Sequence, residues 1–161
     1  MARARSVRLA IFDVDGVMTD GTLYIGPQGE AFKAFNILDG HGVKMLQSAG
    51  VATAIISGRA SEAVTRRAAE LDIAHVVQGS PDKSAAFDKL LASLGVQAEA
   101  CAFVGDDLPD LPVMSRCGFA VAVANACDAV KAAAHYVTRA SGGRGAVREF
   151  CDLVLQAQAA R

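Results

Sequence analysis

Two closely spaced carboxylates follow an apolar run near the beginning of the sequence, where Asp13, Val14, Asp15 and Gly16 succeed each other. An Asp carboxylate can attack phosphorus to form an aspartyl-phosphate, provided that a cation neutralises the negative charge it approaches. Magnesium suits this task because it prefers oxygen ligands and binds through a few carboxylates together with a substrate phosphate. We therefore interpret Asp13 as a nucleophile. Asp15 would protonate the leaving alkoxide and later activate water.

Two cationic sets follow later apolar runs. Ser57, Gly58 and Arg59 combine a hydroxyl, a flexible backbone and a guanidinium, a set that suits phosphate oxygens. Lys83 follows a Ser-Pro pair, and its compact ammonium is placed to pair with both a phosphate and Asp13. Taken singly, Ser57 would more often be a helix cap and Lys83 a solvated surface residue.

A third set is acidic: Gly105 is followed by Asp106 and Asp107, and Asp110 comes shortly after them. Carboxylates grouped in this way predict a metal-binding edge, although an acidic loop on its own is usually just solvated. The joint occurrence of the sets, in the chain order Asp, Ser, Lys, Asp, favours the catalytic interpretation. The first pair alone could open a calcium loop, but an EF-hand would want Asp or Asn at Val17 and Glu at Tyr24.

The elements that must position these residues alternate between short apolar runs and helical patterns. We predict strands at Val7–Val14, Val51–Ile56, Ala74–Gln78, Ala100–Val104 and Phe119–Ala122. Helices are expected at Gly42–Ala49, Ser61–Leu71, Asp82–Leu94, Leu111–Arg116, Ala126–Ala134 and Ala146–Ala160. The alternation indicates an α/β fold, a doubly wound parallel sheet of Rossmann-like type. Ligands bind at the carboxyl ends of the strands in such sheets, which is where the chemical residues fall.

One segment, residues 22–35, breaks this alternation and predicts a β-hairpin around the turn Gly26–Gly29. Its apolar side chains are Leu23, Ile25, Phe32 and Phe35. A lone exposed hairpin cannot bury such residues, so we expect this arm to pack against another subunit. Packing on its own domain is the alternative that the pattern leaves open.

Composition limits the classes of function. A chain of 161 residues fits one domain, 1–161, and a formal net charge of -1 gives no electrostatic footprint for nucleic acid. No segment has the length or apolar character of a membrane span or a secretory signal. Cysteines stand at 101, 117, 127 and 151 without CxxC spacing, in apolar surroundings, and are expected to be buried reduced thiols. A cytoplasmic location follows from these expectations.

The order of the motifs resembles the haloacid dehalogenase superfamily. Within it, residues from about 7 to 158 look like the small, capless 3-deoxy-D-manno-octulosonate 8-phosphate phosphatases of lipopolysaccharide synthesis, with the arm in place of a cap domain. The stretches that carry this resemblance are Asp13–Gly21, Phe32–Gly40 and Gly142–Glu149. The resemblance implies a magnesium-dependent phosphatase, active as a homotetramer on a small sugar-acid phosphate.

The same resemblance implies roles for individual residues. Asp13, the backbone carbonyl of Asp15 and Asp106 would hold Mg²⁺, while Ser57 and Lys83 would hold the phosphate. Substrate contacts would come from Asp15, Asn36, Ile37, Leu38, Asp39, Gly40, Lys44, Gly58, Arg59, Arg67, His75 and Lys83, with Asp107 and Asp110 in support.

Several of these positions have ordinary alternatives. By pattern alone Arg67 fits a solvated helix face better than a substrate site, and His75 would more often be a structural histidine than a ligand. Lys44 could equally be a surface residue. The loop Gly142–Gly145 looks mobile, and its Arg144 could reach over a neighbouring site.

Other functions use related residues. A receiver-type regulatory domain also gathers Asp, Ser or Thr and Lys around magnesium, but it places Lys last, whereas Lys83 precedes the final acidic set. A catalytically silent subunit is disfavoured because no expected group is missing, and a phosphomutase would need a cap against water. Phosphatases for nine-carbon keto-deoxy or sialic acid phosphates have nearly the same motifs. In that group an acid tends to follow Ser/Thr-Gly, so Arg59 favours the eight-carbon substrate.

Overall fold

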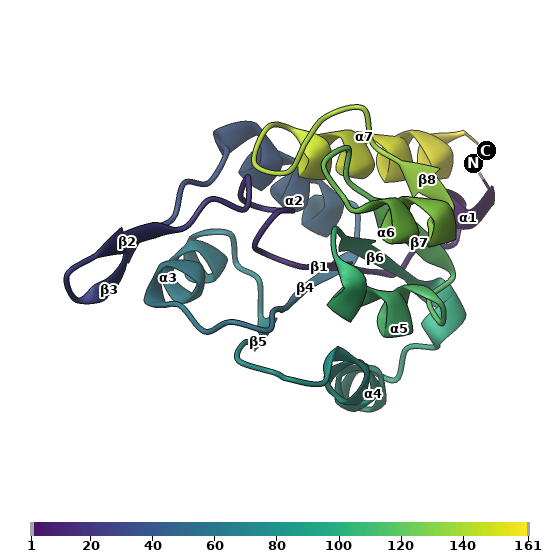
Figure 1. The fold of residues 1–161 in the computed structure, drawn as a ribbon. Coiled ribbons are helices and arrows are strands. Elements are labelled where there is room, and N and C mark those ends of the chain that lie inside the picture. Colours follow the sequence, from purple (N-terminus) through teal and green to yellow (C-terminus); the bar gives the residue numbers. More distant parts are fainter. Residues whose placement is uncertain (1, 161) are drawn as a thin grey trace.

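The computed structural model describes residues 2–160 and is built on a six-stranded sheet (Figure 1). The strand order is β5-β4-β1-β6-β7-β8, and every neighbouring pair is parallel. The strands are β1 (Leu9–Phe12), β4 (Ala52–Ile56), β5 (His75–Val77), β6 (Cys101–Gly105), β7 (Phe119–Ala122) and β8 (Tyr136–Val137). Chain order and strand order therefore differ, as expected for a doubly wound sheet.

The central strands are buried along their whole length, which explains their unbroken apolar sequences. All four residues of β1 are inaccessible, as are the five of β6. A parallel sheet covered by helices on both faces has no solvent side, so apolar and polar residues do not alternate. Because Phe12 is in register with both Ile55 and Val104, the loops after these three strands leave the sheet at the same level.

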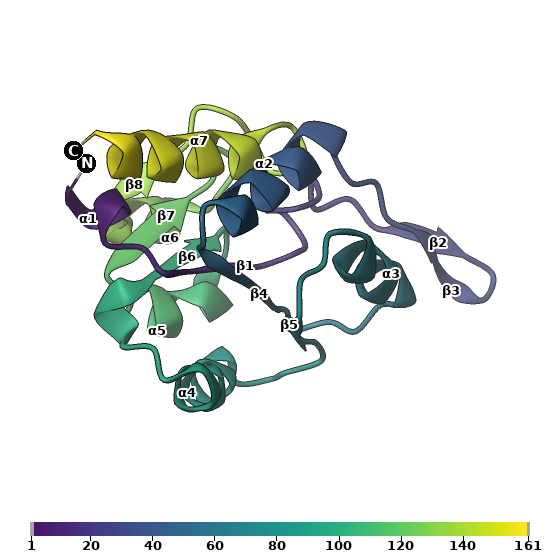
Figure 2. The same cartoon turned by 180° about the vertical axis from the view of Figure 1, so that it is seen from behind.

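Helices cover both faces of the sheet. The α-helices are α1 (Ala2–Arg5), α2 (Ile37–Ser48), α3 (Glu62–Glu70), α4 (Lys83–Leu94), α5 (Leu111–Met114), α6 (Asp128–Ala133) and α7 (Ala146–Ala159). Short 3₁₀ turns stand at η1 (Ala98–Ala100) and η2 (Leu108–Asp110). Figures 1 and 2 show α1, α2 and α7 together on one face, and α4 and α5 on the other.

The expected doubly wound α/β fold is confirmed, and the five predicted strands are all present, with bounds that differ by up to two residues at an end. Strand β8 and helix α1 were not expected, because both are very short. The main error concerns α2, which was expected to begin at Gly42 and begins at Ile37. Asn36 caps this helix, since its Oδ1 accepts hydrogen bonds from the backbone of Leu38 and Asp39. Gly42 interrupts the helical pattern, but it lets α2 lie close against Cys151 of α7.

The arm is an antiparallel hairpin of β2 (Tyr24–Gly26) and β3 (Gly29–Phe32) that extends beyond the sheet (Figure 1). Tyr24 and Phe32 stack across it with ring centroids 4.4 Å apart. Leu23, Ile25 and Phe32 are exposed, as expected for a surface without a partner in its own domain. Phe35 departs from that expectation, because it packs against the hydrophobic core.

The cysteines are free thiols, as expected, and none forms a disulfide. Cys101, Cys117 and Cys151 are buried, whereas Cys127 at the start of α6 is only half-buried. Burial raises the pKa of Cys101 to about 12, and this thiol therefore stays protonated at neutral pH.

Candidate active site

Asp13 and Asp106 lie side by side where β1 and β6 end. The backbone N–H of Asp13 still belongs to the sheet, donating to the carbonyl of Val104 at 3.0 Å, and its carboxyl group is buried. Gly16, with φ +92°, allows the close approach of the two loops. A Cβ at Gly16 would overlap Oδ2 of Asp106, so only glycine fits here.

Lys83 joins this pair from α4. Its Nζ donates to Oδ1 of Asp13 at 2.7 Å and to Oδ1 of Asp110 at 2.6 Å, and its side chain is only 7% exposed. Asp82 caps the helix by accepting from the backbone of Ala85, which fixes the start of α4 at the lysine. A lysine this buried needs charged partners, and it has two.

Asp110 shapes the acidic loop. Its Oδ2 accepts from the backbone N–H of Asp106 at 2.9 Å and of Asp107 at 3.3 Å, while its Oδ1 binds Lys83. Asp107 in turn accepts from the N–H of Leu108 and caps η2. Both oxygens of Asp110 are therefore engaged within the protein, and this residue orients the neighbouring groups.

Crowding of carboxylates in a buried place disfavours their charged forms. Burial and the charge of Asp110 raise the pKa of Asp13 to about 6, although Lys83 acts in the opposite direction. Burial and the charges of Asp13 and Asp110 raise the pKa of Asp106 to about 8. The two carboxylates of Asp13 and Asp110 keep the pKa of Lys83 high in spite of its burial. The site therefore carries unbalanced negative charge at neutral pH.

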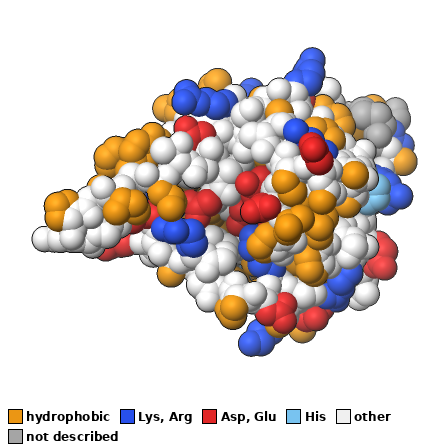
Figure 3. All heavy atoms as spheres, in the orientation of Figure 1, with side chains coloured by type: hydrophobic (Ala, Val, Ile, Leu, Met, Phe, Trp, Pro, Cys, Tyr) orange, Lys and Arg blue, Asp and Glu red, His pale blue; other side chains and the backbone are white. Residues whose placement is uncertain are grey.

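This site fits a divalent cation. One carboxylate oxygen from each of Asp13, Asp106 and Asp110 lies within 4.8 Å of the others. An all-oxygen donor set favours Mg²⁺, and a cation here would relieve the repulsion that raises the two pKa values. Since Asp110 is already engaged, Asp13 and Asp106 are the residues that would hold the ion. Figure 3 shows acidic side chains gathered in the middle of this face of the molecule.

Ser57 and Gly58 follow β4, the strand next to β1. Ser57 is buried, and its backbone donates to the carbonyl of Val77 and accepts from the N–H of Ser80. The register of Phe12 with Ile55 places Ser57 close to the level of Asp13. Gly58 is exposed beside it. The structure thus brings Asp13, Ser57, Lys83 and Asp106 to one edge of the sheet.

Asp15 contacts a cluster that the sequence did not predict. Its Oδ1 accepts from Nζ of Lys33 at 2.6 Å, and Lys33 also binds Glu30 at 2.9 Å. Arg59 lies 3.6 Å from Asp15 and 3.4 Å from Glu30, and Glu30 accepts a further bond from Ser61 at 2.5 Å. Lys33 and Glu30 belong to the arm, where the only sequence signal was a charged pair among apolar residues.

The first turn of α2, where sugar contacts are predicted, also has a structural role. Asp39 is buried, and its Oδ1 accepts from the backbone N–H of Arg148 at 2.9 Å. It therefore caps the N-terminus of α7 from another helix. Its Oδ2 has no partner, and burial raises the pKa of the group. The Asp39 side chain faces protein, whereas those of Ile37 and Leu38 face solvent.

Arg67 packs on this same turn. Its guanidinium donates to the carbonyl of Asn36 at 3.4 Å and to Glu70 at 3.1 Å, and it lies over the ring of Phe35. Gly40 faces this guanidinium, and a side chain there would displace it. Nε of Arg67 is buried without a partner, which leaves a hydrogen bond to be made.

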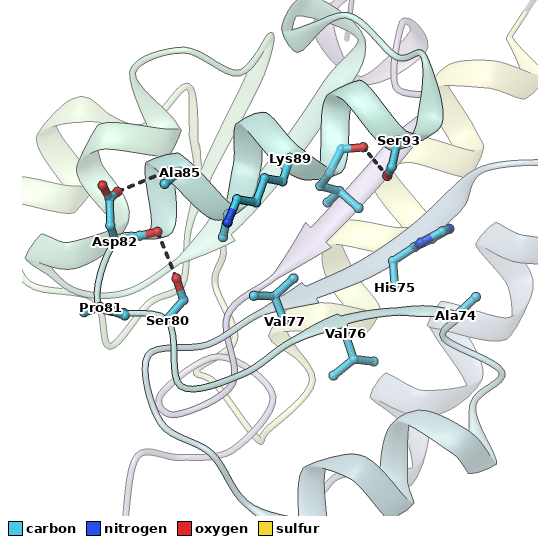
Figure 4. A pocket seen from close by; sticks show the side chains of 12 residues that line it. Ala74, His75, Val76, Val77, Ser80, Pro81, Asp82, Ala85, Lys89 and Ser93 are labelled. Atoms are coloured by element: carbon cyan, nitrogen blue, oxygen red, sulfur yellow. Dashed lines mark hydrogen bonds between the residues drawn. The ribbon is translucent and has the colours of Figure 1, made fainter.

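Lys44 and His75 are not brought to the acidic edge within this chain. Lys44 pairs with Asp72. His75 opens β5 and lines a cavity of about 640 Å³ between β5 and α4 (Figure 4). Neither Asp13 nor Asp106 lines this cavity.

The loop before α7 packs on the loop that follows β1 and carries Asp15 and Gly16, which we call the catalytic loop. This contact contrasts with the mobile segment that was expected. Side chains at Gly142 would overlap the backbone of Gly16, and Asn125 bridges these two glycines by bonds of 3.0 and 2.6 Å. Arg144 extends to solvent and lies 3.6 Å from Asp20 of its own chain.

This chain has well-described relatives. Residues 70–150 match the haloacid dehalogenase-like hydrolase family, the class that the sheet and its acidic edge define. A 3-deoxy-D-manno-octulosonate 8-phosphate phosphatase from Yersinia pestis is 53% identical over 156 residues, which are 97% of this chain and 83% of that protein. The chain belongs to this phosphatase family.

Solved structures agree with this assignment. The phosphatase from Moraxella catarrhalis, in complex with magnesium, phosphate and 3-deoxy-D-manno-octulosonate (KDO), is 43% identical with a TM-score of 0.95. The cobalt-bound phosphatase from Haemophilus influenzae is likewise 43% identical with a TM-score of 0.95. Each match covers 98% of this chain, together with 91% and 92% of the other chain, respectively.

Proposed function

We propose that this protein is a magnesium-dependent phosphatase that hydrolyses 3-deoxy-D-manno-octulosonate 8-phosphate to KDO and phosphate, in the synthesis of lipopolysaccharide precursors. The observation that carries the proposal is the buried Asp13–Lys83–Asp110 contact with Asp106 beside it, at the carboxyl ends of the central strands. The identity of the substrate is inferred from the relatives named above. The whole chain, 1–161, would act as one phosphatase domain.

In the first step, an oxygen of Asp13 attacks phosphorus and the bond to the sugar oxygen breaks. Asp15 donates its proton to that leaving oxygen, so that an alcohol rather than an alkoxide departs. Lys83 and Ser57 hold the phosphate oxygens during the attack. A Mg²⁺ ion held by Asp13, the carbonyl of Asp15 and Asp106 would offset the negative charge that otherwise repels the phosphate.

In the second step, water attacks the phosphorus of the aspartyl-phosphate. Asp15 takes a proton from this water, the bond between phosphorus and Asp13 breaks, and phosphate is released. Asp15 is then protonated again and ready for the next leaving group. Asp110 reacts with nothing in this scheme and keeps Lys83 and the acidic loop in place.

Substrate discrimination is proposed for residues around the site. Arg59 is the first candidate, because it is half exposed and adjacent to Asp15. Asn36, Arg67 and Lys44 are further candidates around the start of α2. A phosphate-release screen over sugar phosphates, with and without Mg²⁺, tests the proposal. If the protein prefers a nine-carbon acid phosphate, the proposed substrate is wrong. If turnover persists after exhaustive metal removal, the magnesium-dependent mechanism is excluded.

We also propose that the active unit is a homotetramer assembled through the arm. Leu23, Ile25 and Phe32 are exposed apolar side chains on the arm, and the arm leads directly into α2. Replacing Leu23 and Ile25 by glutamate is expected to shift the protein toward monomer in sedimentation velocity. Replacing Gln28 at the turn by glutamate is the matched control. A wild-type monomer with full activity and selectivity contradicts the proposal.

A cytoplasmic location without a membrane or nucleic-acid partner completes the proposal. It is supported by the free thiols and by the balanced charge. Within residues 2–160, no helix combines the length and apolarity that a membrane crossing requires. Fractionation of cells that express the tagged protein tests this location.

A further inference from the structure

Lys33 carries an enclosed charge that lies outside the acidic edge. Its side chain is 3% exposed, although it comes from the base of a protruding arm. Lysine is almost never buried to this extent unless it is paired. Its two partners are Asp15 at 2.6 Å and Glu30 at 2.9 Å, so the ammonium lies between a catalytic-loop carboxylate and an arm carboxylate.

The contact is held from several sides. Glu30, 19% exposed, accepts from Ser61 and lies near Arg59, which fixes it to the segment between β4 and α3. Asp15, which is 23% exposed, therefore pairs with Lys33, and the position of this lysine is fixed in turn by Glu30 and by the segment that holds Glu30. The Asp15 side chain is thus held in one rotamer before any ligand binds, which is a feature of pre-organised sites.

Arg59 provides a contrast within the same cluster. It is 50% exposed, and its distances to Asp15 and Glu30 are 3.6 and 3.4 Å, longer than those of Lys33. Such a long, half-exposed side chain can turn toward a substrate anion at little cost. Lys33 cannot do so without giving up its two short contacts with carboxylates.

We propose that Lys33 is a positioning residue: it holds the Asp15 carboxyl group within reach of the leaving oxygen of the bound ester. This inference rests on the proposed role of Asp15 as proton donor. Lys33 itself does not touch the reacting atoms. The base of the arm is thus part of the machinery that delivers the proton, in addition to any part that the arm has in assembly.

The dependence on leaving group tests this role. We would measure kcat/KM, which reports the step in which Asp13 displaces the leaving group, for phosphate esters of a graded series of phenols and simple alcohols. Poor leaving groups need the proton, whereas acidic phenols leave without it. Lys33→Met is expected to lower kcat/KM about 100-fold for the least acidic alcohols and less than about 3-fold for the most acidic phenol. Lys33→Arg should restore much of the loss.

Two controls separate this role from a general loss of structure. Arg66→Met removes an exposed cation of α3 that pairs with Glu62 rather than with Asp15, and it should leave the slope of the series unchanged. In an Asp15→Ala background, Lys33→Met should add no further change in slope, because the group it positions is absent. If Lys33→Met fails to fold, Glu30→Gln loosens the same lysine and should steepen the slope by a smaller amount.

A uniform loss across the series in a folded Lys33 variant, or no loss, overturns the proposal. So does an unchanged slope in Glu30→Gln, or an additional slope change in the Asp15→Ala background. The test does not depend on the natural substrate. If the wild-type protein hydrolyses this series but not the eight-carbon sugar phosphate, the proposed function fails while the Lys33 result stands.

Discussion

Two lysines in this molecule each lie between two carboxylates, but they are built from different parts of the fold. Lys83 joins Asp13 and Asp110, whose side chains are 8% and 1% exposed. Lys33 joins Asp15 and Glu30, which remain open to water on one side. The first cluster joins the end of β1 to η2 and to the start of α4, and the second fixes the arm to the loop after β1. A buried ion pair can thus secure the site itself or join a peripheral element to it.

The largest expected effect comes from the nucleophile in the first cluster. Asp13→Asn keeps the shape of the side chain but replaces the carboxylate by an amide, which is not a competent nucleophile, so turnover should fall on the order of 10⁴-fold or more. Phosphate release measures this effect, and circular dichroism checks that the variant is folded. Near-normal turnover would exclude the aspartyl-phosphate route.

Removing either lysine tests whether the two clusters differ in stability. Lys83→Met leaves Asp13 and Asp110 unpaired in a buried place and should lower the free energy of unfolding by roughly 3 kcal/mol. Lys33→Met should cost only about 1 kcal/mol, because water can reach Asp15 and Glu30. Urea denaturation in metal-free buffer compares the two variants. Equal losses would mean that the exposure of the carboxylates does not decide the cost.

The first cluster also predicts how stability depends on pH. The pKa values of Asp13, about 6, and Asp106, about 8, both lie above the ordinary value of 3.8. The folded protein therefore binds more protons than the unfolded chain above pH 3.8. This contribution to stability is fully present below about 3.8 and is lost progressively as pH rises from there through about 6 for Asp13 and about 8 for Asp106. Without metal, the melting temperature should fall across this window.

Asp106→Asn should reduce this fall in melting temperature, since an amide has no charge to repel the neighbouring carboxylates. At high pH the variant should have a free energy of unfolding higher than that of the wild type by on the order of 1–2 kcal/mol. Added Mg²⁺ should protect the wild-type protein most at the high-pH end and the variant much less. Thermal melts with and without Mg²⁺ measure both effects. A pH-independent melting temperature in the metal-free protein would contradict the repulsion.

The smallest effect is expected where neither partner is buried. Glu62 and Arg66 form an exposed pair on one turn of α3, with side chains about three-quarters accessible. Exposed pairs of this kind gain little, because water and salt screen them. Glu62→Gln and Arg66→Gln should leave the melting temperature unchanged within error. A clear loss would show that this pair is coupled to the nearby arm.

The two clusters also differ in how well the sequence predicts them. Asp13, Ser57, Lys83 and Asp106 follow successive strands, and the rule that parallel strands end at one edge is enough to bring them together. Lys33 follows no such rule, because its contact depends on how the hairpin leaves the sheet. Sequence similarity to a family likewise does not predict which side chains of a motif pack within the protein and which face the substrate.

Asp39 illustrates this second limit. Its motif predicts a substrate contact and gives no sign that the residue also caps a helix that begins more than 100 positions later in the chain. Such a bond depends on the relative placement of α2 and α7, which no local pattern encodes. The start of α2 was missed for a related reason, because Gly42 weakens the helical signal while allowing the two helices to approach.

The close contact between Gly142 and Gly16 has a consequence for genetics. Gly142 leaves no room for a methyl group above Gly16, and Gly16 leaves none beside Asp106. Two backbones and the Asp106 carboxyl group are therefore stacked in series, and a bulkier residue at Gly142 displaces that carboxyl group. A screen for inactive alleles should recover substitutions at Gly142 as readily as at Asp106. Second-site suppressors of these alleles should arise in the opposite loop, where a compensating shift restores the spacing.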